Sequence, residues 1–272
     1  MKQYQYLKTT VHNGNILEVL LNRPDVRNAI NPRLKQEWND LLDAADADPE
    51  IRVVTVRGEG PVFSAGGDIK EAAPGYVKEG VATGWSKEPP PYLPRAWYFR
   101  KVLIAGVHKY VGPEAFNLLG YCDFIIAAEK TKFSFEVTRF GSEGNASSIL
   151  AMQLPMRVLK KLYLMGGWFE AEQALKWDFV QRVVPVDAVS GEVRNWAVEA
   201  SKIEPTQVRA MKHTLHRIYE ILGLVNLEGI GNRGSGHGAD GDKEFYAMIL
   251  EKGMKAALKH RDSRFDATIA RV

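Results

Sequence analysis

Short apolar runs alternate with amphipathic stretches along the first half of the chain. The runs are rich in β-branched residues and predict strands at 16–21, 51–57, 102–107 and 124–128. Between the first two, Asn31 and Pro32 supply a capping side chain and a first-turn proline, which together predict a helix start. Apolar residues then recur on one helical face at Leu34, Trp38, Leu41, Leu42 and Ala45. Near-continuous apolar strands separated by helices are typical of a covered, mostly parallel sheet.

The second half of the chain is mainly helical in pattern. From about residue 145 onward the sequence predicts a short strand at 180–184 and helices over 189–202, 205–222 and 245–259. Two stretches rich in glycine or proline, 75–94 and 229–241, are expected to be irregular. We therefore expect an α/β core over residues 1–190 and a helical C-terminal region over 191–272.

Composition and charge exclude several classes of protein. The chain has 272 residues, is 45% hydrophobic and can bury one large core. A net charge of +3 does not suggest a nucleic-acid binder. The single cysteine, Cys122, excludes an internal disulfide and fits a reducing compartment. The first residues lack the apolar segment of a signal peptide, and no apolar run approaches the roughly 18–20 residues that span a bilayer. We expect a cytoplasmic protein that does not enter a membrane.

Histidines give no indication of a metal site. His213, His216 and His237 have no carboxylate or cysteine partner at ligand intervals, so we expect no bound metal. His108 directly follows the predicted strand at 102–107, where a hydrogen-bonded structural role is more common than a role as a base.

The segment from Phe63 to Lys70 is the strongest candidate for chemistry. Ala65, Gly66 and Gly67 follow a strand and let a ligand lie directly on the peptide groups, whose N–H donors can face a developing negative oxygen. A strand-to-helix turn also needs small residues for purely geometric reasons, so the pattern alone leaves both interpretations open.

The ordered set of short motifs resembles the crotonase (enoyl-CoA hydratase/isomerase) superfamily over about residues 8–266. The matching pieces are Asn22–Pro24 with Arg27–Ala29, the loop at 63–70 with Glu71, Ile104-Ala105 leading to Cys122-Asp123, Phe133 with Gly141, Leu164–Gly166, Glu170 to Val184, and Glu251–Met254 with Arg261 and Phe265. One departure is Asp178-Phe179, where the family has Gly-Leu.

This resemblance implies a spiral of ββα units with a helical C-terminal trimerisation region, assembled as a homotrimer or homohexamer. It also implies acyl-CoA thioester substrates, with coenzyme A entering as part of the substrate and no permanently bound cofactor. The thioester oxygen would lie between the backbone N–H groups of Ala65 and Glu114. The adenine part of coenzyme A would meet the backbone at two segments, Arg27-Asn28-Ala29 and Gly67-Asp68-Ile69.

The second donor has a physical basis in the sequence as well. Gly112-Pro113-Glu114 opens a predicted helix over 113–121, and the first turn of a helix carries free N–H groups. Family members typically carry three glycines where Pro113, Glu114 and Ala115 stand here. A carboxylate at Glu114 would repel an enolate if it turned inward.

The usual catalytic groups of the family are missing. Alignment without gaps places the two glutamates of the hydratases on Asn117 and Val137, and neither can act as a general base. Asn117 can still orient water or a carbonyl group. Three nearby carboxylates, Glu143, Glu136 and Glu114, are alternative proton carriers.

Three functions remain open at the level of sequence. The favoured one is a hydratase-like lyase acting through a stabilised thioester enolate. A ring-opening C–C hydrolase of a cyclic β-ketoacyl-CoA is suggested by the loop from Gly141 to Ser148, and a non-catalytic acyl-CoA-binding subunit by the missing glutamates. A bulky or cyclic acyl group is expected if a run of aromatic residues lines the pocket instead of packing in the core: Trp85, Tyr92, Trp97, Tyr98 and Phe99.

Overall fold

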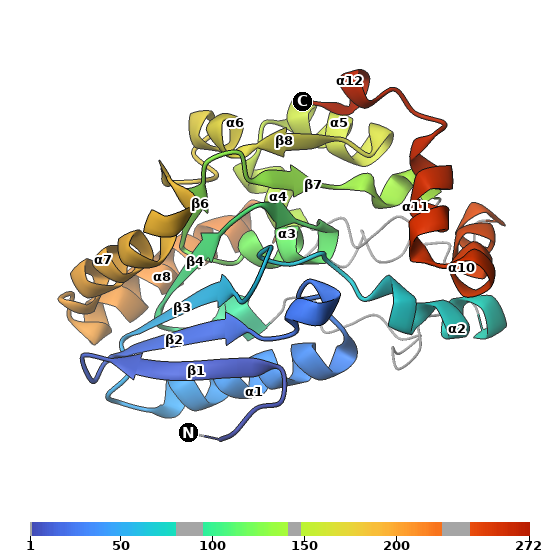
Figure 1. Ribbon diagram of the computed structural model, residues 1–272. Coiled ribbons are helices and arrows are strands. Elements are labelled where there is room, and N and C mark those ends of the chain that lie inside the picture. Colours follow the sequence, from blue (N-terminus) through green and yellow to red (C-terminus); the bar gives the residue numbers. More distant parts are fainter. Residues whose placement is uncertain (1, 80–94, 141–147, 225–239) are drawn as a thin grey trace.

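The computed structural model describes residues 2–79, 95–140, 148–224 and 240–272. Its main sheet has six strands in the order β1-β2-β3-β4-β6-β9 (Figure 1). They are β1 (Leu7–His12), β2 (Ile16–Leu21), β3 (Val53–Gly58), β4 (Val102–Val107), β6 (Phe124–Ala128) and β9 (Arg182–Val184). β1 is antiparallel to β2, and the other pairs are parallel, which confirms the predicted mostly parallel α/β sheet.

Helices cover both faces of this sheet. Alternate strand residues point to opposite faces, so neighbours such as Val53 and Val54 belong to different clusters. One face packs against α7 (Val189–Ser201), and the other against α1 (Pro32–Ala47) and α3 (Pro113–Leu119). The side chain of Asn31 caps α1 by accepting a hydrogen bond from Leu34 N at 2.9 Å, as predicted.

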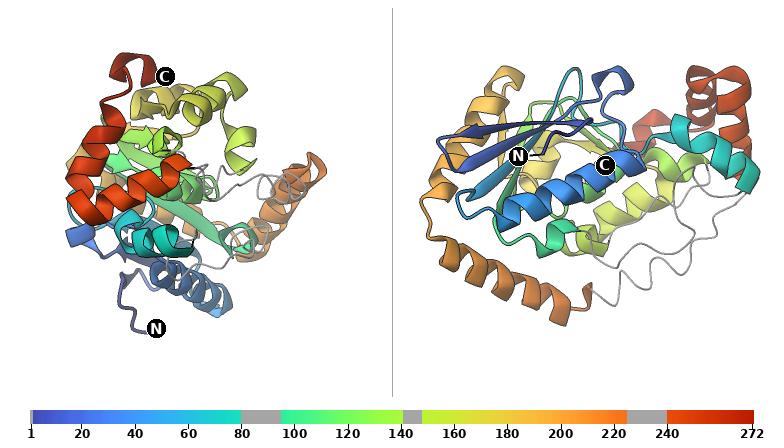
Figure 2. Two further views of the ribbon diagram at one scale, coloured as in Figure 1. Left: turned by 90° about the vertical axis from the view of Figure 1, so that its right-hand side faces the viewer. Right: turned by 90° about the horizontal axis from the view of Figure 1, so that it is seen from below.

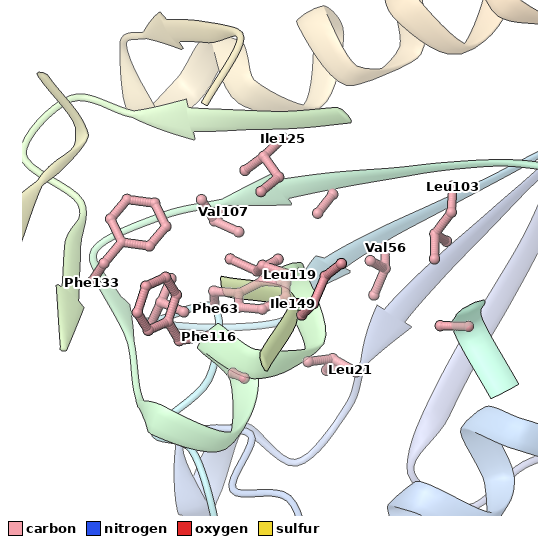
Figure 3. Packing of buried hydrophobic residues seen from close by; sticks show 14 of the residues in the cluster. Leu21, Val56, Phe63, Leu103, Val107, Phe116, Leu119, Ile125, Phe133 and Ile149 are labelled. Atoms are coloured by element: carbon pink, nitrogen blue, oxygen red, sulfur yellow. The ribbon is translucent and has the colours of Figure 1, made fainter. Parts of the chain in front are cut away.

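A second, smaller sheet holds α3 in place. It contains β5 (Tyr110–Val111), β7 (Lys132–Ser134) and β8 (Trp168–Glu170). Phe116 of α3 packs against Phe133 and Phe169, with ring centroids 6.0 and 5.7 Å apart. Figure 3 shows Phe116 and Leu119 among buried side chains from both sheets. These contacts fix the direction in which the first turn of α3 points.

The other helices form the edges and the C-terminal part. They are α2 (Ile69–Glu79), α4 (Ser148–Gln153), α5 (Met156–Met165), α6 (Ala171–Lys176), α8 (Pro205–Ile221), α10 (Asp240–Lys252), α11 (Met254–Asp262) and α12 (Ala267–Ala270), with 3₁₀ turns at Pro24–Val26, Arg95–Tyr98, Glu136–Phe140 and Val186–Ala188. α10 packs on α2, whereas α8 lies on a different side of the core (Figure 2).

Three expectations from the sequence need correction or comment. The helix expected over 245–259 is divided at Gly253, whose φ of +82° ends α10 before α11 begins. Gly75 to Glu79, expected to be irregular, belong to α2, because Ala73 packs against α10 and this contact outweighs the local signals. The expected division at residue 190 falls inside α7, and a separation into two domains stays a prediction.

Two backbone segments, 63–66 and 110–113, lie directly side by side. Ser64 and Gly112 are hydrogen-bonded, with Gly112 N 2.9 Å from Ser64 O. A Cβ atom on Gly112 would lie 2.0 Å from the carbonyl oxygen of Ala65, so no other residue fits there. Gly66 adopts φ +91°, and a Cβ atom on it would lie 2.9 Å from Pro113 N. Glycine at both positions permits this close backbone contact.

The contact predicts a sharp difference between two glycine substitutions. Gly112→Ala should lower the free energy of unfolding by about 2–3 kcal/mol, because the added methyl group overlaps the Ala65 backbone. Gly67→Ala is the matched control, since its Cβ atom meets no described atom within 4 Å, and its effect should stay within about 0.5 kcal/mol. Urea denaturation of both variants measures this difference. Equal stability of the two variants would contradict the proposed contact.

His108 fixes the turn that leads into the second segment. Its Nε2 lies 3.0 Å from the carbonyl oxygen of Gly60, and His108 O accepts a hydrogen bond from Phe63 N at 3.0 Å. Burial lowers the pKa of His108 below its ordinary value, and the charges of Arg57 and Lys109 act in the same direction. The ring is therefore neutral in the folded protein at neutral pH and serves a structural role.

Acid should weaken the fold partly through this residue. Because the pKa of His108 is lower in the folded than in the unfolded chain, its stabilising effect is present above pH 6.5 and is lost as the pH falls through the folded-state value. His108→Gln keeps a donor for Gly60 O and removes the titration. The free energy of unfolding of this variant should fall less steeply between pH 6.5 and 5 than that of the wild type. Identical slopes would argue against the assignment.

Candidate active site

The N–H groups along the Phe63–Lys70 loop are almost all occupied. Ser64 N donates to Tyr110 O at 3.3 Å, Gly66 N donates to Ser64 Oγ at 3.1 Å, and Asp68 N donates to Ile30 O at 2.9 Å. Ala65 N donates to the carbonyl oxygen of Arg27 at 2.8 Å. This bond uses the hydrogen that we assigned to a substrate oxygen. The prediction of Ala65 as the first donor is therefore wrong.

Two N–H groups of the loop remain: Lys70, in the first turn of α2, provides one, and Gly67, which directly follows the contact at Gly66, provides the other. Among the described residues the N–H of Gly67 has no hydrogen-bond acceptor, and the space beside its Cα is open. The residues on either side of Gly67 are held by Ile30, whose N–H donates to Gly66 O at 2.7 Å and whose O accepts from Asp68 N. Parallel pairing of this kind leaves the intervening N–H pointing away from the partner strand. Sequence reasoning missed it because the pairing joins segments far apart in the chain.

The first turn of α3 provides a second set of donors. Gly112 precedes the helix, Pro113 occupies its first position, and Phe116 N is the first to bond back, to Gly112 O at 2.8 Å. Within the described part of the chain, the N–H groups of Glu114 and Ala115 have no acceptor. The glycine contact between the two segments therefore brings Gly67 and Glu114 to either side of one junction. Two such donors can share one carbonyl oxygen and stabilise negative charge on it.

The side chain of Glu114 is ion-paired. Its carboxylate bonds to the ammonium group of Lys35, which extends from α1, and the two side chains are 21% and 33% exposed. Glu114 is therefore not a free carboxylate beside the donors, and its charge is partly compensated.

The two positions of the hydratase glutamates carry no titratable group. Asn117 is buried on α3, one turn after Glu114. Val137 packs in an apolar cluster with Ala73 of α2 and Tyr246 of α10. Tyr76 and Tyr246 stack beside it, with ring centroids 4.2 Å apart. The site around position 137 is thus apolar and aromatic.

Glu136 lies in a charged cluster next to this site. Its carboxylate accepts from Lys132 Nζ at 2.9 Å and from Tyr110 OH at 3.4 Å, and Arg261 lies 3.6 Å away. Burial, together with the Glu136 charge, raises the pKa of Tyr110 to about 12, so this hydroxyl stays protonated. Two cations and a hydroxyl group thus hold the Glu136 carboxylate in place, so it is not free to turn toward a substrate. Glu143, the third candidate, lies outside the described residues.

The predicted coenzyme A segments lie together. The bonds of Ile30 described above join the Arg27–Ala29 segment to the Gly67–Ile69 segment, and Arg23 forms an ion pair with Asp68 at 2.9 Å. Asn28 is fully buried, and its amide group donates to the carbonyl oxygens of Glu59, Val62 and Phe63. Arg27 is exposed and adopts φ +54°.

Three of the aromatic residues that could line an acyl pocket are described, and they lie partly in the core and partly on the surface. Trp97 stacks on His216 with ring centroids 4.0 Å apart, Phe99 is 1% exposed, and Tyr98 is exposed. Trp97 and Phe99 therefore pack in the core beneath α8, whereas Trp85 and Tyr92 lie outside the described residues.

The described residues contain neither a metal-binding cluster nor a membrane-spanning helix. Within the ranges given above, no three His, Cys, Asp or Glu side chains gather in a way that could hold a metal ion, and the absence of a metal stays a prediction. No helix in those ranges has the length and apolar character needed to cross a bilayer.

Comparison with known proteins gives a consistent result. The chain is 31% identical to carnitinyl-CoA dehydratase of Citrobacter koseri over 204 residues, which cover 73% of this chain and 76% of the relative. It is 28% identical to (E)-benzylidenesuccinyl-CoA hydratase of Thauera aromatica, with coverage of 73% and 78%. The crystal structure of an enoyl-CoA hydratase/isomerase from Xanthobacter autotrophicus Py2 superposes with a TM-score of 0.87 at 27% identity, covering 97% of this chain and 100% of that one.

The expected fold and family are confirmed by these similarities. The sequence model of the family described as "Enoyl-CoA hydratase/isomerase" matches residues 11–230. Together with the crotonase-type arrangement of its sheet and helices, this match means that the chain belongs to the enoyl-CoA hydratase/isomerase family of the crotonase superfamily.

Proposed function

We propose that the protein is a hydratase- or dehydratase-type lyase that acts on an acyl-CoA thioester, with the thioester oxygen bound by the N–H groups of Gly67 and Glu114. The observation that carries the proposal is that the N–H groups of Gly67 and Glu114, on two turns joined at Gly66 and Gly112, have no acceptor among the described residues. Electron density that moves onto the oxygen when the α-carbon loses a proton is stabilised by both donors. The similarity to carnitinyl-CoA dehydratase supports this class of reaction.

Coenzyme A arrives as part of the substrate, and no permanent cofactor takes part. Its adenine end lies along Arg27–Ala29 and Gly67–Ile69, which the structure joins by backbone hydrogen bonds. Arg27 has no ion-pair partner among the described residues and is exposed, so its guanidinium group is available to a phosphate.

Because Asn117 and Val137 stand where the hydratases have their two glutamates, another carboxylate has to transfer the proton. The carboxylates of Glu114 and Glu136 are both held by cations and are therefore not free to turn toward a substrate. Glu143 is the remaining candidate of the three and is proposed as the proton carrier. Asn117 orients the water or the hydroxyl group by hydrogen bonding rather than by proton transfer.

The acyl group is proposed to be bulky or cyclic. Valine at position 137, where a glutamate is expected in the hydratases, leaves this wall of the site uncharged. The stacked Tyr76 and Tyr246 rings add flat apolar surface next to it. The similarity to (E)-benzylidenesuccinyl-CoA hydratase agrees with an aromatic acyl group. Trp97 and Phe99 do not support this point, because both are buried in the core.

A pair of substitutions tests the proton carrier. Glu143→Gln should reduce kcat by about 10²-fold or more, because Gln cannot accept a proton, whereas Glu136→Gln should change it much less. Glu129→Gln, on an exposed turn, is the control. The assay uses enoyl-CoA and 3-hydroxyacyl-CoA esters with linear, cyclic and aromatic acyl groups.

The same assay separates the competing functions. Hydration adds water and keeps any ring, whereas hydrolysis of a cyclic β-ketoacyl-CoA opens the ring and leaves a new carboxylate. Binding of the esters without any turnover would indicate a non-catalytic acyl-CoA-binding subunit and would overturn the enzymatic proposal.

One face of α8 supports the proposed homotrimer or homohexamer. Met211, Leu215, Ile218 and Leu222 recur at helical spacing and are half exposed or more, as is Ile221. An apolar stripe of this length is more typical of a subunit contact than of a surface in water.

Leu215→Lys should therefore weaken assembly. A charge placed in a buried apolar contact is costly, so the variant should shift toward monomers at concentrations where the wild type is assembled. Sedimentation or light scattering measures the shift. Val186→Lys, on an exposed turn outside the stripe, is the matched control and should leave the mass unchanged. A monomeric wild type would contradict the proposed assembly.

A further inference from the structure

Lys35 lies in the first turns of α1, directly after the Ile30–Asn31 segment that positions the N–H group of Gly67. Ile30 is hydrogen-bonded to the residues on both sides of Gly67, and Asn31 caps α1 directly after it. Lys35 N donates to Asn31 O at 3.1 Å, so Lys35 lies one turn into this helix. Asn31 also donates to the carboxylate of Glu71 on α2 at 2.8 Å. The start of α1 is thus fixed to the loop of the candidate active site.

The partner of Lys35 is the residue that supplies the second N–H donor. Glu114 bonds to the Lys35 ammonium group through its carboxylate, while its backbone N–H lies in the first turn of α3. Both side chains are more than half covered, so solvent screens their charges less than it screens those of a surface pair. The ion pair therefore connects α3, whose first turn carries the N–H group of Glu114, with α1, which follows the Ile30 segment that is hydrogen-bonded around Gly67.

The charge on Glu114 has a direct consequence for an enolate. A carboxylate on the residue that donates to the oxygen would raise the energy of a negative oxygen beside it, and a cation next to that carboxylate offsets the repulsion. We propose that Lys35 neutralises the carboxylate of Glu114 and thereby sets the stability of the thioester enolate held by the N–H groups of Gly67 and Glu114. This inference rests on the proposed function and adds a positioning residue to it.

Two other roles for Lys35 make different predictions. If the ion pair were a purely mechanical link between α1 and α3, Lys35→Met, Glu114→Gln and the double variant would all break it and would have equal effects. As a ligand for a phosphate of coenzyme A, Lys35 would affect the affinity for the thioester and would do so independently of Glu114. Electrostatic compensation instead predicts opposite effects of the two single substitutions.

Acetoacetyl-CoA provides a readout that does not depend on turnover. Its C2 carbon loses a proton to solvent to give an enolate, whose ultraviolet absorbance reports the ionised fraction of the bound thioester. Lys35→Met should raise the apparent pKa of the bound thioester by about 1 pH unit, a tenfold change in ionisation constant. Glu114→Gln should lower the apparent pKa, and the double variant should lie between the two. Lys202→Met, which removes an exposed ion pair with Glu199 on α7, is the control.

The outcomes separate the inference from the function on which it rests. Opposite shifts in the two single variants support electrostatic compensation, and a folding defect cannot produce them because it would act in one direction. Equal shifts in all three variants, or a change in affinity alone, would overturn the role of Lys35 and leave the proposed function intact. If the wild-type protein does not bind acetoacetyl-CoA, the proposed function fails and the inference fails with it.

Discussion

The backbone contact between the Gly66 and Gly112 segments is the constraint on which the site depends. These segments come from the ends of two neighbouring parallel strands, β3 and β4, and meet without any intervening side chain. Everything proposed for catalysis requires their two turns to stay in register. The core enforces this register: Phe116 of α3 packs against the small sheet, and His108 ties the second segment to the loop before the first. Core packing outside the two turns therefore determines the direction of the N–H groups of Gly67 and Glu114.

Three carboxylates around the candidate site each lie beside a cation. Glu114 faces Lys35, Asp68 faces Arg23, and Glu136 faces Lys132. An enolate in this environment meets little uncompensated negative charge, which favours its formation. Each of these carboxylates is already engaged by its cation, so none of the three is free to approach a substrate proton. Stabilisation of the intermediate and proton transfer are thus expected to fall to different groups.

Local patterns predicted the main strands and α1 well, because apolar periodicity and capping chemistry act within a few residues. Asp178, where the family has glycine, adopts φ +56°, a left-handed conformation that the sequence analysis did not predict. The first donor could not be predicted locally. Whether Ala65 or Gly67 has a free N–H depends on pairing with residues 27–30, and this pairing is invisible in the loop sequence. β5, β7 and β8 were missed for the same reason, since partners elsewhere in the chain define them. β1 was missed although it forms a hairpin with β2, the next strand in the sequence.

Two departures of this chain from the family pattern, at Asn117 and at Glu114 on α3, are easier to understand as one change than as two separate ones. The gap-free alignment with the hydratases predicts that α3 loses a carboxylate at Asn117 and gains one at Glu114, which would keep its total charge and move the negative charge one turn toward the proposed donors. At the new position the carboxylate cannot serve as the former base and would oppose an enolate. A lysine within bonding distance on α1 removes that conflict. A glycine at the same position would need no such partner, so Glu114 and Lys35 are best regarded as a single electrostatic unit of this particular protein.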